Sequence, residues 1–359
     1  MKVGILSMQR VMNYGSFLQG YALKKIIENL GHQCEFIDIE QGRIFPELRR
    51  SYSFILKKVI DRFCKWDALT RLMYMYKFQR RFKKEFFELL GINVHTIGYF
   101  DLVVIGSDEV FNFAQQIPWG FCTQLYGRVH NTNKVISYAG SFGHTTMDDI
   151  RYFEVQDEIA SSLSSMAAIS VRDIYSFDII KELTGKEAII NIDPVLLFDY
   201  TSYVCPVNKK DYIIVYSYPN RIKAKEEVSV IKSFAKKYGK KLISIGFYFP
   251  WCDETIIPNP FEVLGYIKGA DYIITDTFHG SVMSIKYNRP FAALVRSSNQ
   301  QKMISLLSQF KLEDRIVSNM ALLEKSLLLP IQYQEINEII DKEKIRSLEY
   351  LKFNLWVRL

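Results

Sequence analysis

Short apolar runs alternate with longer amphipathic stretches along the first half of this 359-residue chain. Helical spacing of apolar residues marks 16–30, 148–165 and a stretch from Ile174. Runs of strand length lie at 2–7, 34–39, 102–105, 134–138, 167–171 and 188–192. Strands that alternate with helices in this way pair in parallel through crossover helices. The pattern predicts an N-terminal Rossmann-like domain over residues 1–200.

The second half repeats the alternation. Helical stretches lie at 224–238, 261–268, 279–287 and 301–310, and strand-like runs lie at 212–217, 241–246, 271–275 and 290–295. We therefore expect a second Rossmann-like domain over 211–330, joined by a linker at 198–210. Apolar residues at helical spacing in 331–359 predict a C-terminal helix that packs back on the body. The predicted fold class is α/β, with two Rossmann-like domains facing a ligand-binding cleft.

Composition narrows the class of protein. Hydrophobic residues make up 48% and charged residues 24% of the chain, as in globular proteins. The five cysteines are widely separated and form no CxxC pair, which argues against a disulfide framework and a zinc site. The N-terminal residues do not resemble a signal peptide, and no apolar run reaches the length of a membrane span. These features predict a cytoplasmic protein.

One segment carries most of the positive charge. Residues 49–84 contain twelve Lys and Arg against two Asp, while the whole chain has a net charge of +7. We interpret 49–90 as a basic helical insertion in the N-terminal domain. The favoured role is a solvated helical pair whose charge eases the approach of anionic substrates. Peripheral contact with an anionic membrane through 49–84 is the second interpretation. Nucleic-acid binding ranks last, and no nucleic-acid partner is predicted.

The turn 276–280 is the strongest candidate for chemistry. It joins a buried strand to a helix, and the unpaired N–H groups that open a helix bind anions such as phosphate. A histidine ring can transfer protons near neutral pH, and His279 lies between Thr277 and Ser281, with Gly280 beside it. A structural histidine is the alternative. The other four histidines lie in expected loops without converging polar neighbours, so no metal site is predicted.

Three turns at strand ends of the first half offer further candidates. Asn13 and Gly15 precede a helix and form either a substrate-binding loop or an ordinary helix cap. This turn lacks the GxGxxG pattern, which argues against a dinucleotide ligand. Ser107 and Asp108 follow the strand 102–105, and Asp108 either contacts substrate or caps a helix. Arg172 follows the strand 167–171, as an anion ligand or as part of a surface ion pair.

The turn at Asp193 comes directly before Pro194, and we interpret it as structural.

Five segments occur in the order and spacing of polysaccharide pyruvyl transferases. They are GILSMQRVMNYGSFLQGYAL, DLVVIGSDEVFN, ISVRD, NIDPVLLF and DYIITDTFHGSVMSIKYNRPF. The chain resembles this family from Val3 to about Arg315. The resemblance implies a GT-B-like pair of Rossmann domains. It also implies transfer of a pyruvyl group from phosphoenolpyruvate onto two hydroxyls of a sugar, giving a cyclic ketal. The donor is a substrate, so no separate cofactor is expected.

The family's acceptor is usually a sugar of a lipid-linked oligosaccharide at the inner membrane face. The resemblance therefore implies a surface-polysaccharide precursor as acceptor and gives the basic segment 49–84 a role at the membrane.

The resemblance also implies roles for individual residues. His279 and Asp108 are the expected catalytic residues, with His279 as general acid/base and Asp108 beside the acceptor. The expected substrate-binding residues are Arg172, Asn13, Gly15, Ser107, Thr277, Gly280, Ser281 and Arg296. Some relatives have an arginine two residues before the histidine, where this chain has Thr277. The second positive charge for phosphoenolpyruvate must then come from elsewhere, with Arg289, Arg296 and Lys302 as candidates.

Two other functions fit the same pattern. A GT-B glycosyltransferase would place the diphosphate of a nucleotide sugar against His279. A binding module of a polysaccharide assembly complex would bind the ligand without turnover. The acceptor sugar, its hydroxyl pair, the ketal stereochemistry and the oligomeric state lie beyond the sequence.

Overall fold

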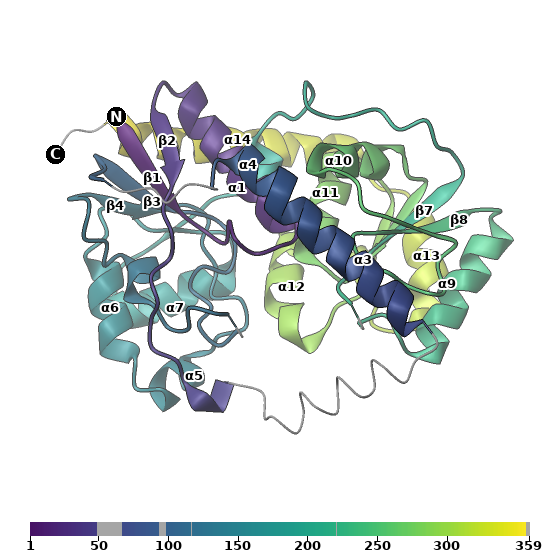
Figure 1. Cartoon of the computed structure of the whole chain (residues 1–359), viewed down its shortest axis with the longest axis horizontal. Coiled ribbons are helices and arrows are strands. Elements are labelled where there is room, and N and C mark those ends of the chain that lie inside the picture. The colour runs from purple at the N-terminus through teal and green to yellow at the C-terminus, as the bar shows by residue number, and fades with distance from the viewer. Residues whose placement is uncertain (49–66, 93–97, 116, 220, 357–359) are drawn as a thin grey trace.

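Two separate parallel sheets carry the fold. The computed structural model describes residues 1–48, 67–92, 98–115, 117–219 and 221–356 (Figure 1). The first sheet has the order β2-β1-β3-β4, and its strands are β1 (Lys2–Leu6), β2 (Gln33–Phe36), β3 (Leu102–Ile105) and β4 (Val135–Ser137). A bridge between Ile136 and Ala168 connects it to the parallel pair β5 (Ser170–Val171) and β6 (Ile189–Ile190).

The second sheet has the order β11-β10-β7-β8-β9 and is also parallel throughout. Its strands are β7 (Tyr212–Tyr216), β8 (Lys241–Ile245), β9 (Glu254–Ile256), β10 (Tyr272–Thr275) and β11 (Phe291–Ala293). All residues of β7 are buried, as expected for a strand covered on both faces. The two sheets confirm the predicted pair of Rossmann-like domains.

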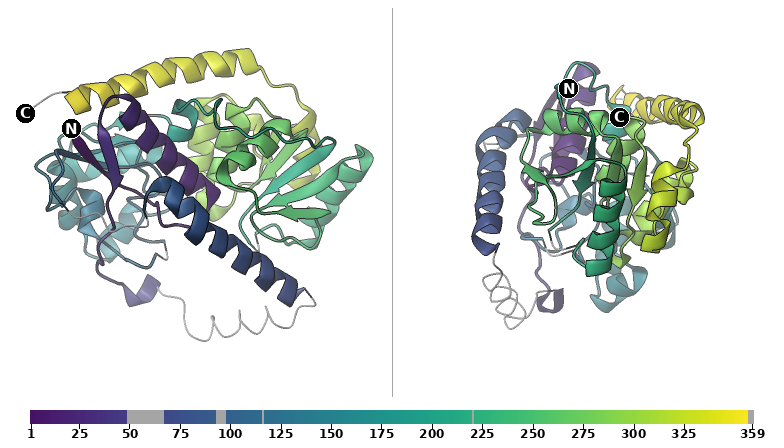
Figure 2. Two further views of the ribbon diagram at one scale, coloured as in Figure 1. Left: turned by 45° about the horizontal axis from the view of Figure 1, so that its top comes forward. Right: turned by 90° about the vertical axis from the view of Figure 1, so that its right-hand side faces the viewer.

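Helices cover both sheets (Figures 1 and 2). The described helices are α1 (Tyr14–Asn29), α3 (Ala68–Arg81), α4 (Phe87–Leu90), α5 (Met147–Tyr152), α6 (Gln156–Ser164), α7 (Ile174–Thr184), α8 (Pro194–Leu197), α9 (Lys225–Lys237), α10 (Pro260–Gly269), α11 (Phe278–Lys286), α12 (Gln300–Gln309), α13 (Leu323–Leu328) and α14 (Tyr333–Trp356). None of these helices is both long enough and apolar enough to cross a bilayer.

The long helix α14 returns from the second domain to the first (Figure 2, yellow). Tyr350 donates a hydrogen bond from its hydroxyl to the carbonyl of Ser137 in β4, at 2.7 Å. Lys134 donates to the carbonyl of Asn354 at 2.8 Å. The C-terminal helix, which follows the second domain in sequence, is thus held against the first domain.

Helix α3 crosses the opposite side of the molecule (Figure 2, dark blue). The predicted helix 49–90 is described only from residue 67, and 49–66 lie outside the described residues. A π-helical turn, Phe82–Phe86, joins α3 to α4. The rings of Phe78 and Phe82 each lie 5.5 Å from the ring of Tyr14, whose hydroxyl donates to the carbonyl of Pro258 at 2.8 Å. This aromatic cluster fixes α3 against both domains.

Several predicted elements differ from the structure. The helix expected at 148–165 is two helices, because Glu154 adopts φ +53° between α5 and α6. The strands expected at 167–171 and 188–192 pair over only two residues each. Strand β9 was not predicted, since three half-buried residues give no usable periodicity.

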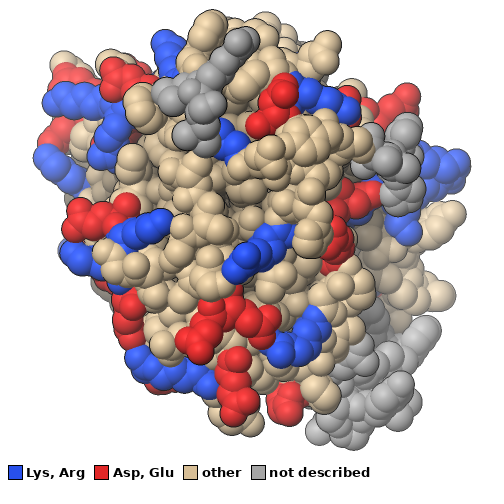
Figure 3. Space-filling model, turned by 90° about the vertical axis from the view of Figure 1, so that its left-hand side faces the viewer, with Lys and Arg blue, Asp and Glu red and all other residues tan. Residues whose placement is uncertain are grey.

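Positive and negative side chains are interspersed on the N-terminal face (Figure 3). Among its described residues, this face carries no broad patch of one sign. The arrangement is typical of an ordinary solvated surface.

Candidate active site

A polar cavity of about 230 Å³ lies between the two domains at the carboxyl ends of their strands. From the first domain it is lined by Asp108 and Glu109, which follow β3. From the second domain it is lined by the turn after β10 and by Lys302 of α12. Parallel α/β sheets place ligands at this edge, where side chains of several turns converge.

His279 lies in the first turn of α11, whose N-cap Thr277 accepts a hydrogen bond from the amide of Gly280 at 3.0 Å. The imidazole Nε2 is 3.4 Å from a carboxylate oxygen of Asp193. A Cβ on Gly15 would lie 2.4 Å from the imidazole, so the glycine makes room for the ring. Gly15 and His279 come from different domains and lie in contact with each other.

Asp108 adopts φ +83°, an unusual conformation for a residue other than glycine. Its carboxylate accepts a hydrogen bond from the hydroxyl of Ser16 at 2.7 Å. The backbone amide of Ser16 in turn donates to the side-chain oxygen of Asn13 at 2.7 Å. Burial alone would raise the pKa of Asp108, but Arg172 and His279 lower it below its ordinary value. Asn13 therefore caps α1 and reaches the cavity only through Ser16.

Arg172 lies behind the cavity wall. Its side chain is 1% exposed and sits between Asp108, at 3.4 Å, and Asp193, at 3.5 Å. The guanidinium carbon is 4.1 Å from the ring centroid of Phe278, which lines the cavity. Arg172 borders a different cavity, between α7 and α12. In this structure it binds two carboxylates of the protein and does not face the expected substrate site.

Asp193 belongs to this cluster, although the sequence indicated a structural turn. One oxygen caps α8 by accepting from the amide of Val195 at 2.9 Å, and the other faces His279 and Arg172. Burial raises the pKa of Asp193, whereas His279 and Arg172 lower it, with a net lowering. The usable sequence signal was the position of Asp193 at the end of β6, on the same sheet edge as Asp108.

Two cations line the cavity itself. Lys302 pairs with Glu109, and Arg221 lies 3.9 Å from a carboxylate oxygen of Asp276. Lys302 was one of three candidates for the missing positive charge, and Arg221 was not predicted. Arg289 instead contacts the carbonyl of Ala270 at 3.4 Å.

The remaining predicted residues lie near the cavity or behind it. Arg296 pairs with Glu227 at 2.6 Å and reaches Asp276 at 3.9 Å. Ser107 lies 3.4 Å from Asp193. The buried Ser281 has its hydroxyl 4.0 Å from the sulfur of Met303, within the core.

Gly280 has no room for a side chain, because a Cβ would lie 2.1 Å from the hydroxyl of Thr275.

The prediction for His144 was wrong. We expected it in a loop without polar neighbours, yet it lines the cavity and its Nδ1 is 3.1 Å from the side-chain nitrogen of Asn112. Both residues come from long loops of the first domain, where sequence periodicity gives no information on which side chains meet.

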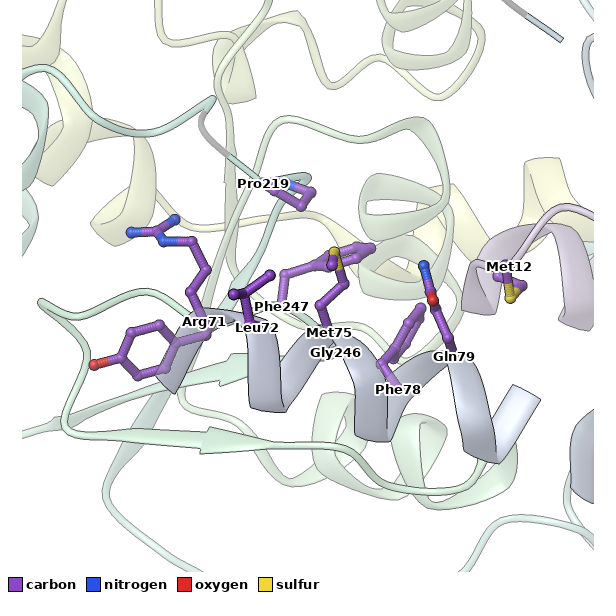
Figure 4. Close-up of a pocket in the computed structure, with 10 residues that line it drawn as sticks. Met12, Arg71, Leu72, Met75, Phe78, Gln79, Pro219, Gly246 and Phe247 are labelled. Carbon is purple, nitrogen blue, oxygen red and sulfur yellow. The ribbon is translucent and has the colours of Figure 1, made fainter. Parts of the chain in front are cut away.

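An apolar pocket of about 310 Å³ lies between α3 and the second domain (Figure 4). Leu72, Met75 and Phe78 of α3 form one wall, and Pro219 and Phe247 from the second domain lie opposite. The ring of Phe247 is 6.2 Å from the ring of Tyr218, which lines the polar cavity. The apolar pocket and the polar cavity are therefore adjacent. The cleft thus offers a polar cavity beside an apolar pocket.

The charge cluster gives a first prediction. Replacing Arg172 with Met leaves two buried carboxylates without their cation, so the free energy of unfolding should fall by about 3–5 kcal/mol in denaturant titrations at neutral pH. Arg151 is the matched control, because it also bridges two carboxylates but is 54% exposed. Arg151→Met should cost at most about 1 kcal/mol.

The difference in free energy of unfolding between wild type and Arg172→Met should depend on pH. Asp108 and Asp193 have lowered pKa values in the folded state. Their contribution to the free energy of unfolding is therefore complete above the unfolded-state pKa of about 3.9, and it is lost as pH falls through their folded-state pKa values. The stability difference should therefore shrink below about pH 4. An equal difference at acidic and neutral pH would contradict the role of the two carboxylates.

Comparison with solved structures identifies the fold. The chain aligns with Arabidopsis thaliana UGT89C1 complexed with quercetin at a TM-score of 0.53 and 10% identity, covering 99% of both chains. It aligns with S. aureus MnaA bound to UDP at a TM-score of 0.52 and 10% identity, covering 99% of this chain and 96% of that one. These likenesses confirm a GT-B-like α/β fold.

Comparison with curated protein sequences gave no match. The sequence profile described as polysaccharide pyruvyl transferase matches residues 13–298. That range contains the turns that hold Asp108, Arg172, Asp193 and His279. The chain belongs to the polysaccharide pyruvyl transferase family.

Proposed function

We propose that this protein transfers the pyruvyl group of phosphoenolpyruvate onto two hydroxyls of a sugar in a surface-polysaccharide precursor, forming a pyruvate ketal. The observation that carries the proposal is the polar cavity, where Lys302, Arg221 and the first turn of α11 surround a space next to His279. Phosphoenolpyruvate has a phosphate and a carboxylate, and both cations and a helix N-terminus favour such anions.

His279 is suited to proton transfer from the attacking sugar hydroxyl. The imidazole is largely buried at the cavity wall, and its Nε2 lies 3.4 Å from the carboxylate of Asp193. An imidazolium formed during hydroxyl addition would be stabilised by this negative charge. The sugar oxygen then bonds to C2 of phosphoenolpyruvate, phosphate leaves, and a neighbouring hydroxyl closes the ketal.

The adjoining apolar pocket is the proposed acceptor site. Phe78, Phe247 and Tyr248 supply aromatic rings to this pocket. Arg71 also lines it, and its guanidinium forms an ion pair with the carboxylate of Asp67 at 2.7 Å. Sites for organic ligands combine apolar walls with a few fixed polar groups. An acceptor bound here would present its hydroxyls to the shared wall of the polar cavity.

A lipid-linked acceptor is supported by the outer face of α3. Leu69, Met73 and Tyr76 are 82%, 45% and 64% exposed, and they recur at helical spacing on one side of the helix. Exposed basic residues follow them at Arg80 and Lys83. Apolar side chains flanked by basic ones are typical of helices that lie on anionic membrane surfaces.

The catalytic proposal predicts loss of turnover in His279→Gln. Phosphate release from phosphoenolpyruvate, measured with a panel of synthetic galactosides and hexosamines, should fall by about 10²–10⁴-fold. His130→Gln changes an exposed loop histidine and serves as control. Near-normal turnover in His279→Gln would remove the catalytic role. Release of nucleotide diphosphate from a sugar nucleotide, with no phosphate from phosphoenolpyruvate, would instead identify a glycosyltransferase.

The acceptor site predicts a selective effect of Met75→Trp. The larger side chain fills the apolar pocket, so the KM for the acceptor should rise while the affinity for phosphoenolpyruvate stays at the wild-type value. Met73→Trp alters the same residue type on the exposed face of the same helix and should leave both constants unchanged in a detergent-free assay with a water-soluble acceptor. Equal effects of the two variants would argue against this acceptor site.

The membrane interaction predicts binding to anionic vesicles. Wild-type protein should sediment with phosphatidylglycerol vesicles at low salt and stay in solution with phosphatidylcholine vesicles. The double variant Leu69→Glu/Tyr76→Glu should lose this binding. Ile345→Glu/Phe353→Glu, which changes two exposed residues of α14, is the control and should still bind. Unaltered binding of the α3 variant would refute the role of this face.

A further inference from the structure

Asp276 is a fully buried carboxylate at the wall of the polar cavity, directly after β10. By strict hydrogen-bond geometry neither of its carboxylate oxygens has a partner among the described residues, although the Ser217 hydroxyl and the Tyr218 amide help to lower its pKa. Burying an ionised carboxylate without partners is costly, and such a group favours its protonated form or binds a ligand. The cavity in front of Asp276 is where the donor substrate is proposed to lie.

The surroundings hold Asp276 in place without neutralising it. Its backbone carbonyl accepts hydrogen bonds from Asn299 at 2.6 Å and from Arg221 at 3.4 Å. The nearest cationic nitrogens, on Arg221 and Arg296, are each 3.9 Å from the carboxylate, beyond hydrogen-bonding distance. Two buried nitrogens of Arg296 also have no partner among the described residues. Among the described residues, the carboxyl group therefore has no close cationic partner, and Asp276 borders the cavity in which a ligand would lie.

The protonation of Asp276 follows from the same environment. Burial raises the pKa of Asp276 above its ordinary value, although Arg221, the hydroxyl of Ser217 and Arg296 oppose the shift. Asp108 and Asp193 have lowered pKa values instead. Carboxyl groups in one site whose pKa values are shifted in opposite directions are suited to opposite roles in proton transfer.

Ketal formation has a proton requirement that His279 does not meet alone. The methylene carbon of phosphoenolpyruvate must gain a proton as the first sugar oxygen bonds to C2. In the same step His279 removes the proton of that hydroxyl. A base that accepts a proton cannot donate one in the same step, so a second, initially protonated group is required.

We propose that Asp276 is the general acid that protonates the methylene carbon of phosphoenolpyruvate and then the base for the second sugar hydroxyl. The inference rests on the proposed function. In the first step the Asp276 proton forms a C–H bond, and the first hydroxyl proton passes to His279 as the C2–O bond forms.

In the second step the bond between C2 and the phosphate oxygen breaks. Phosphate leaves with the proton from His279, and the second hydroxyl adds to C2 while its proton returns to Asp276. One hydroxyl proton thus ends on carbon and the other on phosphate, and both side chains regain their starting states.

The test compares wild type with Asp276→Asn, which keeps the shape of the side chain but cannot donate the proton. With phosphoenolpyruvate and an acceptor that the panel identifies, phosphate release should fall by about 10²–10⁴-fold. The affinity for phosphoenolpyruvate, measured by calorimetry, should be retained, which also excludes misfolding as the cause. Glu227→Gln removes the other carboxylate bound to Arg296, outside the cavity lining, and should keep most of the turnover.

A partial reaction isolates the carbon protonation. With an acceptor lacking the second hydroxyl, reversible addition in D₂O should exchange deuterium into the vinyl position of phosphoenolpyruvate, followed by proton magnetic resonance. Wild type and Glu227→Gln should catalyse this exchange, and Asp276→Asn should not.

The outcomes separate the two claims. If wild type releases phosphate and Asp276→Asn exchanges deuterium at the wild-type rate, the role of Asp276 is wrong and the proposed function stands. If wild type releases no phosphate from phosphoenolpyruvate with any acceptor of the panel, both the function and the role of Asp276 fall.

Discussion

The buried contact of Arg172 with Asp108 and Asp193 is the interaction on which the arrangement of the cleft depends. One guanidinium lies between carboxylates from two different strand ends, and Asp193 in turn faces His279 of the other domain. Removing charges from water is costly unless they stay together. The cluster therefore fixes the relative position of four turns, and with them the two domains.

This buried cluster also determines which charged side chains remain at the cavity. Because Arg172 is paired with carboxylates of the protein, the Lys and Arg side chains that the described residues place at the cavity are Lys302 and Arg221, each beside an acidic residue of its own. An anionic ligand would compete for these cations and leave the structural cluster intact. The apolar pocket on the α3 side has a different character, which suits a second, less charged substrate.

The alternation of apolar runs and amphipathic stretches was sufficient to predict the two parallel sheets, because each strand needs a crossover helix to reach its neighbour. The turns at Asp108, Arg172 and His279 were also predictable, since strand ends of parallel sheets share one edge. What the sequence does not contain is which side chains meet across the cleft. Arg172 was expected to bind substrate, but in the structure it binds Asp108 and Asp193 instead.

The other omissions have related causes. Asp193 precedes a proline and caps α8, so its local role concealed its contact with His279. Arg221 and His144 lie in irregular segments, where no periodicity indicates which way a side chain points. Such residues become part of a site only through contacts between distant segments of the chain.

Calorimetric titration of phosphoenolpyruvate tests the central claim, that the polar cavity binds this donor, most directly. The account predicts saturable binding to the wild-type protein, markedly weaker binding to Lys302→Met and Arg221→Met, and no competition from a nucleotide sugar. Binding of the nucleotide sugar with none of phosphoenolpyruvate, or full affinity for phosphoenolpyruvate in both variants, would contradict it.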